Sequence, residues 1–397
     1  MTIRFLTSGE SHGRGLMGII EGIPSGFPLA AEDIDAELRR RQGGYGRGGR
    51  MKIESDQAAI ISGVRWGETL GSPIGILIEN RDWQNWEEGM SPEAGYRGTI
   101  KPVTRPRPGH ADLAGALKYG HDDIRNVLER SSARETAMRV GLGAVAKKVL
   151  SEFGIVIGSF VIGIGSVRAK ARAVPSAEKE LHDLFTSAEQ SPVRCPDPQL
   201  SRKMVKIIDR AVKEGDSLGG IFEVFATGLP VGLGSHVHGD RRLNARLCAA
   251  VMSIQAIKGV EVGLGFDMAK GFGSEVMDEI FYKAPRRATG SGFYRKTNNA
   301  GGIEGGISNG MPVIIRAAMK PIPTLRRPLM SVDLRTKKKF EAAYERSDVC
   351  AVPAAAVVAE AMAALAVVDA FFEKFGGDSR AEVRRNFDSY RSYLSGV

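Results

Sequence analysis

The spacing of apolar and polar residues predicts a chain that mixes helices with strands. Runs that alternate, or that are rich in β-branched residues, predict strands at residues 3–7, 15–21, 51–61, 74–79, 155–161, 219–227 and 312–319. Apolar residues three and four positions apart predict helices at residues 28–42, 131–153, 201–214, 241–257 and 351–375. Residues 80–107 show no periodicity, and a loop of that length in a folded domain is usually functional or disordered.

The most apolar segment, residues 351–375, is long enough to raise the question of a membrane span. Glu360, Asp369 and Glu373 interrupt it, and alanine is its commonest residue. An acidic side chain at the centre of a bilayer costs roughly 2.5 kcal/mol or more. We therefore interpret the segment as a helix buried within the protein, and we expect no membrane contact.

Two of the predicted helices have similar ends. The triplet Glu-Arg-Ser precedes both, at residues 129–131 and 345–347, and Phe-Gly closes both. Each is apolar on most sides, which indicates burial between layers. The pattern favours an α+β sandwich with an internal pseudo-duplication, in which long central helices lie between antiparallel sheets. Because no low-complexity linker divides the chain, we expect a single domain over residues 1–397, with a peripheral C-terminal tail at about 378–397.

Composition narrows the class of protein. The chain has 397 residues, 43% of them hydrophobic, which is enough to bury a substantial core. Its three cysteines, Cys195, Cys248 and Cys350, are far apart and fit neither a disulfide framework nor a zinc cluster. The N-terminal residues lack the pattern of a secretory signal. These features together predict a cytoplasmic location.

Positive charge is clustered. The formal net charge is +9, and arginine outnumbers lysine in the clusters at residues 39–50, 105–107 and 125–139. A guanidinium binds phosphate or carboxylate through two parallel hydrogen bonds, so the clusters favour an anionic ligand. A solvated basic surface is the plainer alternative. Nucleic-acid binding is less favoured, because the clusters lack interleaved aromatic residues and any nucleic-acid-binding motif.

A glycine-rich stretch at residues 44–49 matches G-x-G-x-x-G, but in the wrong context. It follows a predicted helix, whereas the dinucleotide motif follows a strand and opens a helix. The chain also lacks a phosphate-binding P-loop. We interpret the stretch as a loop that carries Arg47 and Arg50 and is suited to closing over an anion.

Three sites contain histidine. His236 and His238 have strand spacing and could form half of a metal site with Asp240, but no further ligand is evident and we expect no metal. His12 and His110 each lie on a glycine-containing turn with arginines nearby. A structural role is the ordinary explanation for an isolated histidine, but this setting favours catalysis.

Residues at the N-termini of two predicted helices could also take part in binding or catalysis. The run at residues 130–136 places Ser131 and Ser132 at the expected start of a long helix, where free N–H groups cap the helix or bind phosphate. Asp348 stands near the start of the last long helix, where it is either a cap or a catalytic base. Residues 320–324 contain two prolines after a strand, which is suited to holding backbone groups against a flat ligand.

Several of these segments, in order, resemble the chorismate synthase family. They are the turn at 9–13, Arg-Pro-Gly-His-Ala-Asp from Arg107, Arg-Ser-Ser-Ala-Arg-Glu-Thr from Arg130, Ser-His-Val from Ser235, the glycine-rich 301–306 and the run from Lys320. The resemblance covers residues 3 to about 375. It implies a carbon–oxygen lyase that converts 5-enolpyruvylshikimate 3-phosphate to chorismate and phosphate in the shikimate pathway of aromatic amino acid biosynthesis. It also implies a requirement for reduced FMN without net redox change, and a homotetramer.

The resemblance assigns roles to individual residues. His12 would protonate or stabilise the leaving phosphate, His110 would tune flavin protonation, and Asp348 would assist removal of the C6 proton. Substrate anions would be bound by Arg41, Arg47, Arg50, Arg107 and Arg134. FMN would contact Arg130, Ser131, Ser132, Gln255, Ala256, Gly305, Lys320, Pro321, Ile322, Pro323, Thr324 and Arg346. In part of the family Arg41 and Arg47 would bind NADP instead, with NADPH or a separate flavin reductase as the source of electrons.

One segment departs from the family pattern. Many members have Arg-His-Asp-Pro-Cys where residues 346–350 have Arg-Ser-Asp-Val-Cys, so a third histidine is missing while Asp348 remains. Two other functions stay open as alternatives: a flavin oxidoreductase that performs net hydride transfer, and an RNA-binding protein that uses the arginine clusters.

Overall fold

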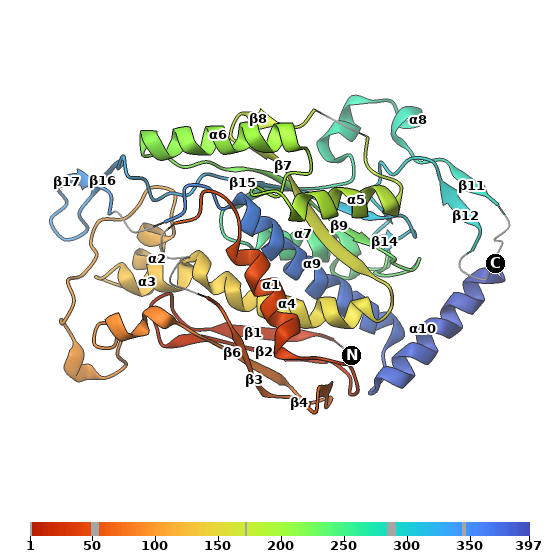
Figure 1. The fold of residues 1–397 in the computed structure, drawn as a ribbon, viewed down its shortest axis with the longest axis horizontal. Coiled ribbons are helices and arrows are strands. Elements are labelled where there is room, and N and C mark those ends of the chain that lie inside the picture. Colours follow the sequence, from red (N-terminus) through yellow and green to blue (C-terminus); the bar gives the residue numbers. More distant parts are fainter. Residues whose placement is uncertain (1, 49–54, 171–172, 284–290, 344–346) are drawn as a thin grey trace.

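Two antiparallel sheets enclose a middle layer of long helices in the computed structural model (Figure 1). The structure describes residues 2–48, 55–170, 173–283, 291–343 and 347–397. The first sheet has the strand order β1 (Arg4–Ser8), β2 (Gly15–Glu21), β6 (Ile74–Glu79) and β3 (Ala58–Ser62). The second has the order β10 (Ile257–Val262), β15 (Val313–Met319), β9 (Gly220–Thr227), β7 (Val156–Ile164) and β8 (Val167–Arg168). The predicted α+β sandwich is confirmed.

The middle layer consists of helices whose apolar sides face both sheets. They are α1 (Ala31–Gln42), α4 (Thr136–Ser151), α7 (Leu243–Met252) and α9 (Val352–Phe375). Leu16 and Ile20 of β2 are fully buried, and a side chain at Gly18 between them would collide with Met138 of α4. The strand alternation thus turns one face of the first sheet toward the helices.

The two helices of the internal echo, α4 and α9, cross closely at the centre of the molecule. A Cβ at Gly143 would lie 2.3 Å from the Cβ of Ala361, so only glycine permits this approach. By length and composition α9 could span a membrane, but 89% of its most apolar window is buried within the protein. The helix therefore forms part of the core, as its three acidic residues predict.

The remaining elements cover the ends and edges of the sandwich. The helices are α2 (Asp112–Tyr119), α3 (Arg125–Ser131), α5 (Glu178–Glu189), α6 (Pro198–Glu214), α8 (Gly273–Val276) and α10 (Arg380–Ser395). Short hairpins are β4–β5 (Val64–Arg65, Glu68–Thr69), β11–β12 (Ile280–Tyr282, Phe293–Arg295), β13–β14 (Ile303–Glu304, Ile307–Ser308) and β16–β17 (Met330–Val332, Lys339–Glu341). The 3-10 turns are η2 (Arg81–Asn85), η3 (Ala94–Tyr96), η4 (Ala133–Glu135), η5 (Gly239–Arg241) and η6 (Gly265–Lys270).

Three predicted boundaries are wrong. The helix expected over 131–153 begins only at Thr136, because Ser132 adopts an extended conformation (φ −63°, ψ 144°) that separates it from α3. The helix expected over 241–257 ends at Met252, and the next strand already begins at Ile257. The strand expected over 51–61 begins at Ala58; residues 51–54 lie outside the described residues.

Candidate active site

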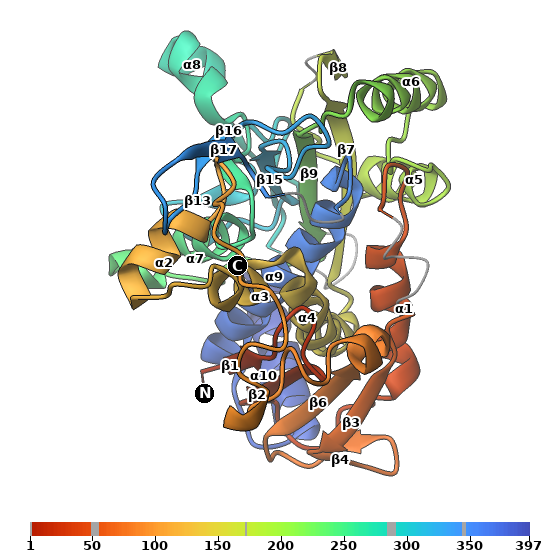
Figure 2. The same cartoon turned by 90° about the vertical axis from the view of Figure 1, so that its left-hand side faces the viewer.

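Loops and turns from separate parts of the chain gather at one end of the sandwich, which faces the viewer in Figure 2. They include the turn after β1, the loop after α1, the long segment 80–107, the break between α3 and α4, and the segment before α9. Each carries at least one residue that the sequence singled out. Polar contacts join them into one site.

His12 is held on two sides. Its Nδ1 lies 2.9 Å from Oε1 of Glu129, and its backbone N–H donates to Oε2 of the same carboxylate at 2.8 Å. Trp86, from the 80–107 segment, lies against the imidazole with 4.1 Å between ring centroids. Burial would raise the pKa of Glu129, but its hydrogen bonds and charge interaction with His12 lower it overall. Because an ionised Glu129 can only accept hydrogen bonds, Nδ1 of His12 carries the proton between the two groups. Nε2 lies on the opposite side of the imidazole ring.

His110 belongs to a second buried group. Its Nδ1 lies 2.5 Å from Oδ1 of Asp112, and Arg107 donates to the same carboxylate through Nε at 2.8 Å and Nη2 at 3.0 Å. Arg107 also donates from Nη1 to the hydroxyl of Thr324 at 3.1 Å. The group therefore joins the turn at 107–112 to the 320–324 segment, as expected if both border one ligand.

Asp112 should make the stability of the protein depend on pH. Burial alone would raise its pKa, but hydrogen bonds from His110 and Arg107 lower it well below its usual range. A lowered pKa in the folded state adds stability at pH values above the unfolded pKa of about 4, and this contribution is lost as the pH falls below that value. We expect Asp112→Asn to reduce the free energy of unfolding by about 3–5 kcal/mol at neutral pH.

The difference from wild type should shrink in urea unfolding curves measured below pH 4. The exposed Asp388 of α10 offers a matched control. Asp388→Asn should leave the curves within about 0.5 kcal/mol of wild type at every pH. A deficit of Asp112→Asn that stays constant down to pH 2 would contradict this account.

Three arginines and two aspartates form a buried charge cluster. Arg134 donates from Nη1 to Oδ1 of Asp56 at 2.6 Å, and Nη1 of Arg41 lies 3.7 Å from Oδ2 of the same carboxylate. Arg47 pairs with Asp348 at 2.7 Å, and the backbone N–H of residue 48 donates to the other oxygen of Asp348 at 2.6 Å. Within the part of the chain that the structure describes, these three guanidinium groups contact two shared carboxylates.

Arg41 has the features expected of a residue that receives an anion. It is 4% exposed, and its Nη1 makes no hydrogen bond within the described residues. Its Nε and Nη2 donate to Thr136 Oγ1 and to the carbonyl of Ala133, which fixes the guanidinium. Burial, followed by the charge of Arg47, lowers the pKa of Arg41 to about 9. A bound anion would accept a hydrogen bond from this unmet donor and would be attracted by the neighbouring guanidinium groups.

Short contacts connect the three groups. Asn80 donates to the carbonyls of Glu10 and Gly13 on the His12 turn, and its Oδ1 accepts from Nε of Arg134. At the other side, Ser347 donates to the carbonyl of Thr324 at 3.3 Å, directly beside Asp348. Every described residue predicted to bind substrate, together with the three predicted catalytic residues, lies in this connected site. Arg50 and Arg346 lie outside the described residues.

Of the two roles expected at the start of the long helix, a helix cap or a phosphate site, the cap is found at Ser132. Ser131 ends α3 and donates back to the carbonyl of Val127, while Ser132 caps only the short turn η4 by accepting from the N–H of Arg134. Arg130 donates to the carbonyls of Thr7 and Gly9. Since η4 runs directly into α4, Ser132 caps the start of this helical segment, and phosphate binding by these three residues stays a prediction.

Gln255, Ala256 and Lys320 meet at one edge of the second sheet. The N–H of Lys320 donates to the carbonyl of Ala256, which has the left-handed backbone angle φ +67°, rare for a residue other than glycine. Oε1 of Gln255 is buried and accepts no hydrogen bond within the described chain. Burial and the charge of Lys258 lower the pKa of Lys320. An unmet acceptor and a strained peptide beside a lysine fit a polar ring system such as a flavin.

Gly305 is placed apart from this group. It lies at the turn of the β13–β14 hairpin, where a Cβ would approach His236 at 3.9 Å. His238 is exposed and pairs with Asp240 at 2.7 Å, and neither histidine is in a strand. Among the described residues no group of three potential metal ligands occurs.

The sequence missed the partners that hold the predicted residues. Glu129, Trp86, Asp112, Asp56 and Asn80 all touch a predicted residue, yet only Asp112 lies near its partner in the chain. Glu129 stands in the repeated Glu-Arg-Ser triplet, which is the one signal that could have drawn attention to it. The others follow from tertiary contacts alone.

Comparison with known proteins decides the family. The family model described as chorismate synthase matches residues 3–372. The chain belongs to the chorismate synthase family. It is 59% identical over 394 residues to a chorismate synthase of Geobacter sulfurreducens, which covers 99% of each chain. It is 55% identical over 395 residues to that of Aquifex aeolicus, covering 99% of this chain and 98% of the relative.

A solved structure agrees. A crystal structure of chorismate synthase superposes with a TM-score of 0.81 at 46% identity, over 100% of this chain and 99% of the other. Membership makes this protein a carbon–oxygen lyase of aromatic biosynthesis that acts on a small molecule.

Proposed function

We propose that the site eliminates phosphate from 5-enolpyruvylshikimate 3-phosphate to give chorismate, with reduced FMN required and no net redox change. One observation carries the proposal: Arg41 is buried close to two other arginines, and its Nη1 makes no hydrogen bond within the described residues. The substrate has two carboxylates and a phosphate, and any of these groups could accept a hydrogen bond from this donor.

The substrate anions are divided between the two arginine groups. Arg41, Arg47 and Arg134 bind one anionic end, with Arg50 of the neighbouring loop also proposed to contribute. Arg107 is already fixed by Asp112 and Thr324, so it presents a rigid guanidinium edge to another anion at little cost in entropy. Held at several points, the substrate has a single orientation at the reacting bonds.

Proton movements fall to three residues. His12, oriented by Glu129 and Trp86, offers a proton from Nε2 to the departing phosphate. Asp348 takes part in removal of the C6 proton; substrate binding would draw Arg47 toward the anion and leave the carboxylate available as a base. His110, whose Nδ1 lies 2.5 Å from Oδ1 of Asp112, is held in the group that contacts the 320–324 segment, where it would tune the protonation of the flavin.

FMN is proposed to lie between these groups. Gln255, Ala256 and the segment Lys320, Pro321, Ile322, Pro323, Thr324 would hold it, with Arg130, Ser131, Ser132, Gly305 and Arg346 contributing as the resemblance implies. When bound in its reduced form, FMN supplies the reversible electron donation that the elimination requires. Arg41 and Arg47 would bind NADP only if the enzyme reduces its own flavin with NADPH, the alternative being a separate flavin reductase.

A spectroscopic experiment separates this function from net hydride transfer. Under anaerobic conditions, reduced FMN with substrate should yield chorismate over many turnovers while the flavin ends fully reduced. Oxidation of one flavin per product would instead indicate an oxidoreductase. Consumption of NADPH in the absence of dithionite would identify the source of electrons.

We also propose that residues 1–397 form one domain in a cytoplasmic homotetramer. In support, one cluster of buried apolar residues extends from Leu16 to Phe387, and within it the tail helix α10 packs on α9. The outer face of the first sheet exposes Leu6 (74%), Met17 (50%) and Ile19 (40%), and the helices of the middle layer pack on the other face. Another copy of the chain would cover such an apolar face.

A charge placed on that face should break the assembly. Leu6→Lys combined with Ile19→Lys is expected to lower the mass measured by light scattering from that of a tetramer to that of a dimer or monomer, because burying two unpaired ammonium groups is costly. Val212→Lys, at an exposed apolar position of α6, is the matched control and should leave the mass unchanged. A tetramer in both variants would place the interface elsewhere.

A further inference from the structure

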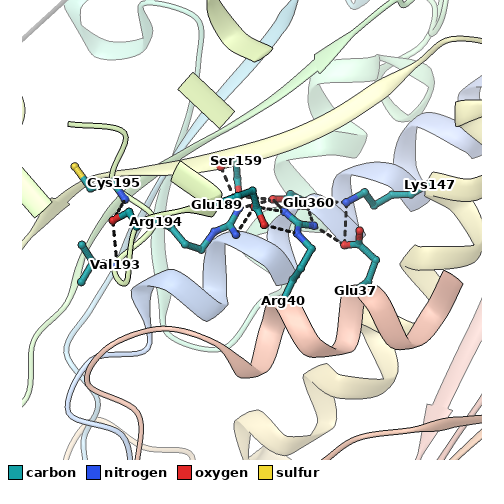
Figure 3. Close-up of polar contacts among 10 residues, drawn as sticks. Glu37, Arg40, Lys147, Ser159, Glu189, Val193, Arg194, Cys195 and Glu360 are labelled. Carbon is teal, nitrogen blue, oxygen red and sulfur yellow. Dashed lines mark hydrogen bonds and ion pairs between the residues drawn. The ribbon is translucent and has the colours of Figure 1, made fainter. Parts of the chain in front are cut away.

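Glu360 lies fully buried in the middle of α9, within a network of charged side chains (Figure 3). Arg40 donates to both of its oxygens, at 2.7 and 2.9 Å, and Lys147 donates at 2.8 Å. Arg194 and Ser159 donate at 3.1 and 2.5 Å. The network ties α9 to α1, α4, β7 and the turn before α6, which are the elements around the arginine cluster.

Energetics alone do not explain this network. Glu37 contacts Arg40 and Lys147, and Glu189 contacts Arg40 and Arg194, so three cations face three carboxylates. A balanced buried network is often no more stable than apolar residues of the same size, because desolvation offsets the attraction. What it does provide is a fixed geometry, since a guanidinium fork fits a carboxylate in few orientations.

One arm of the network runs through α1 to the site. Arg40 and Arg41 are adjacent in the last turn of this helix, and Gly43 follows as its C-cap. Arg40 points to Glu360, while Arg41 reaches the other way, to Thr136 and Ala133. The last turn is therefore clamped from two sides, and the position of Arg41 depends on the hold on Arg40.

A second arm runs through the turn at residues 191–194. Arg194 has the left-handed angle φ +56°, and its guanidinium reaches Glu360 and the carbonyl of Ser159. Two residues earlier, the carbonyl of Pro192 accepts a 2.7 Å hydrogen bond from the N–H of Tyr45. Tyr45 lies two residues before Arg47, in the loop that closes against Asp348. Through Arg194 and this turn, the carboxylate of Glu360 thus also helps to fix the position of Arg47.

We propose that Glu360 is a positioning residue: through Arg40 and Arg194 it places Arg41 and Arg47 for the binding of the substrate anions. This rests on the proposed function in one respect, the identity of the anion. Glu360 itself lies away from the reacting atoms, behind the helix and the turn that present the two arginines.

The test is Glu360→Gln, which keeps the shape of the side chain and removes its charge. Glu223→Gln is the matched control, because Glu223 is also buried (2% exposed) and pairs with an arginine, Arg316 of β15. The first measurement is hydrogen exchange of the peptide 40–48 in the ligand-free enzyme. The second is calorimetric binding of 5-enolpyruvylshikimate 3-phosphate, followed by KM and kcat.

Glu360→Gln should speed exchange over 40–48 and weaken substrate binding by about 10- to 100-fold, with KM rising far more than kcat falls. Glu223→Gln should do neither, even if it lowers the melting temperature equally. Unchanged exchange and affinity in Glu360→Gln, or equal changes in both variants, would overturn the proposal. If exchange over 40–48 is faster in Glu360→Gln but the wild-type protein does not bind this substrate, the proposed function is refuted. The positioning role of Glu360 is then retained.

Glu189→Gln keeps the proposal testable if Glu360→Gln fails to fold. Glu189 is 30% exposed at the edge of the network and contacts both Arg40 and Arg194. Its replacement should produce the same two changes, to a smaller extent. A folded Glu189→Gln variant with wild-type exchange and affinity would also count against the network.

Discussion

His12→Ala should slow flavin-dependent phosphate release by about 10²- to 10⁴-fold, the range typical for loss of a general acid. The imidazole is the one titratable side chain on the 9–13 turn that is locked from both sides, by Glu129 and by Trp86. Because the proposed role of His12 is to protonate the departing phosphate, kcat should fall while the affinity for substrate changes by less. Rapid-quench measurement of phosphate with dithionite-reduced FMN would record the effect.

Two further variants sharpen this prediction. Glu129→Gln keeps a hydrogen-bonding partner at Nδ1 but removes the charge, and should give a smaller loss together with an altered pH profile of kcat. His238→Ala, at an exposed histidine paired with Asp240, should retain wild-type activity. A His12→Ala variant with more than half of the wild-type kcat would show that another group protonates the leaving phosphate.

Asp348→Asn should produce the second large effect, a fall in kcat of about 10²-fold or more. The asparagine can still accept from the N–H of residue 48 but cannot take a proton, so the loop stays in place while the base is lost. Arg47→Met removes the other member of the same 2.7 Å pair. If Arg47 binds substrate as proposed and moves no proton, this variant should raise KM more than it lowers kcat.

The contrast between the two variants is the decisive feature. Slow release from Asp348→Asn, a raised KM in Arg47→Met, and a normal exposed control such as Asp240→Asn would support separate roles for the two partners. If Asp348→Asn and Arg47→Met change KM equally and leave kcat intact, Asp348 only orients Arg47. In that case the base must be sought elsewhere in the site.

Local periodicity predicted the four middle-layer helices and most strands of the two sheets, but not β8 or β10. The helix at 28–42 and the buried helix at 351–375 appear as α1 and α9 with nearly the expected bounds. The break before α4 could not be predicted, because apolar periodicity continues through it. The extended backbone of Ser132 is set by its contacts with Ser11 and Arg134. Periodicity reports which face is buried, and tertiary contacts decide where a helix stops.

The site was predicted less completely than the fold. Residue type and glycine context, together with the resemblance, identified His12, His110 and the arginines. Their carboxylate partners were not predicted, since Glu129 is 117 residues from His12 and Asp56 is 78 residues from Arg134. No spacing rule connects residues so far apart. The buried carboxylate of Glu360 was noted in the sequence only as an argument against a membrane span.

The most direct test of the whole account is anaerobic phosphate release from 5-enolpyruvylshikimate 3-phosphate by the wild-type protein, with and without dithionite-reduced FMN. The account predicts many turnovers per subunit with reduced FMN, none with oxidised FMN or without flavin, and equal amounts of phosphate and chorismate. Phosphate release that is independent of flavin, or none from folded protein saturated with reduced FMN, would contradict it.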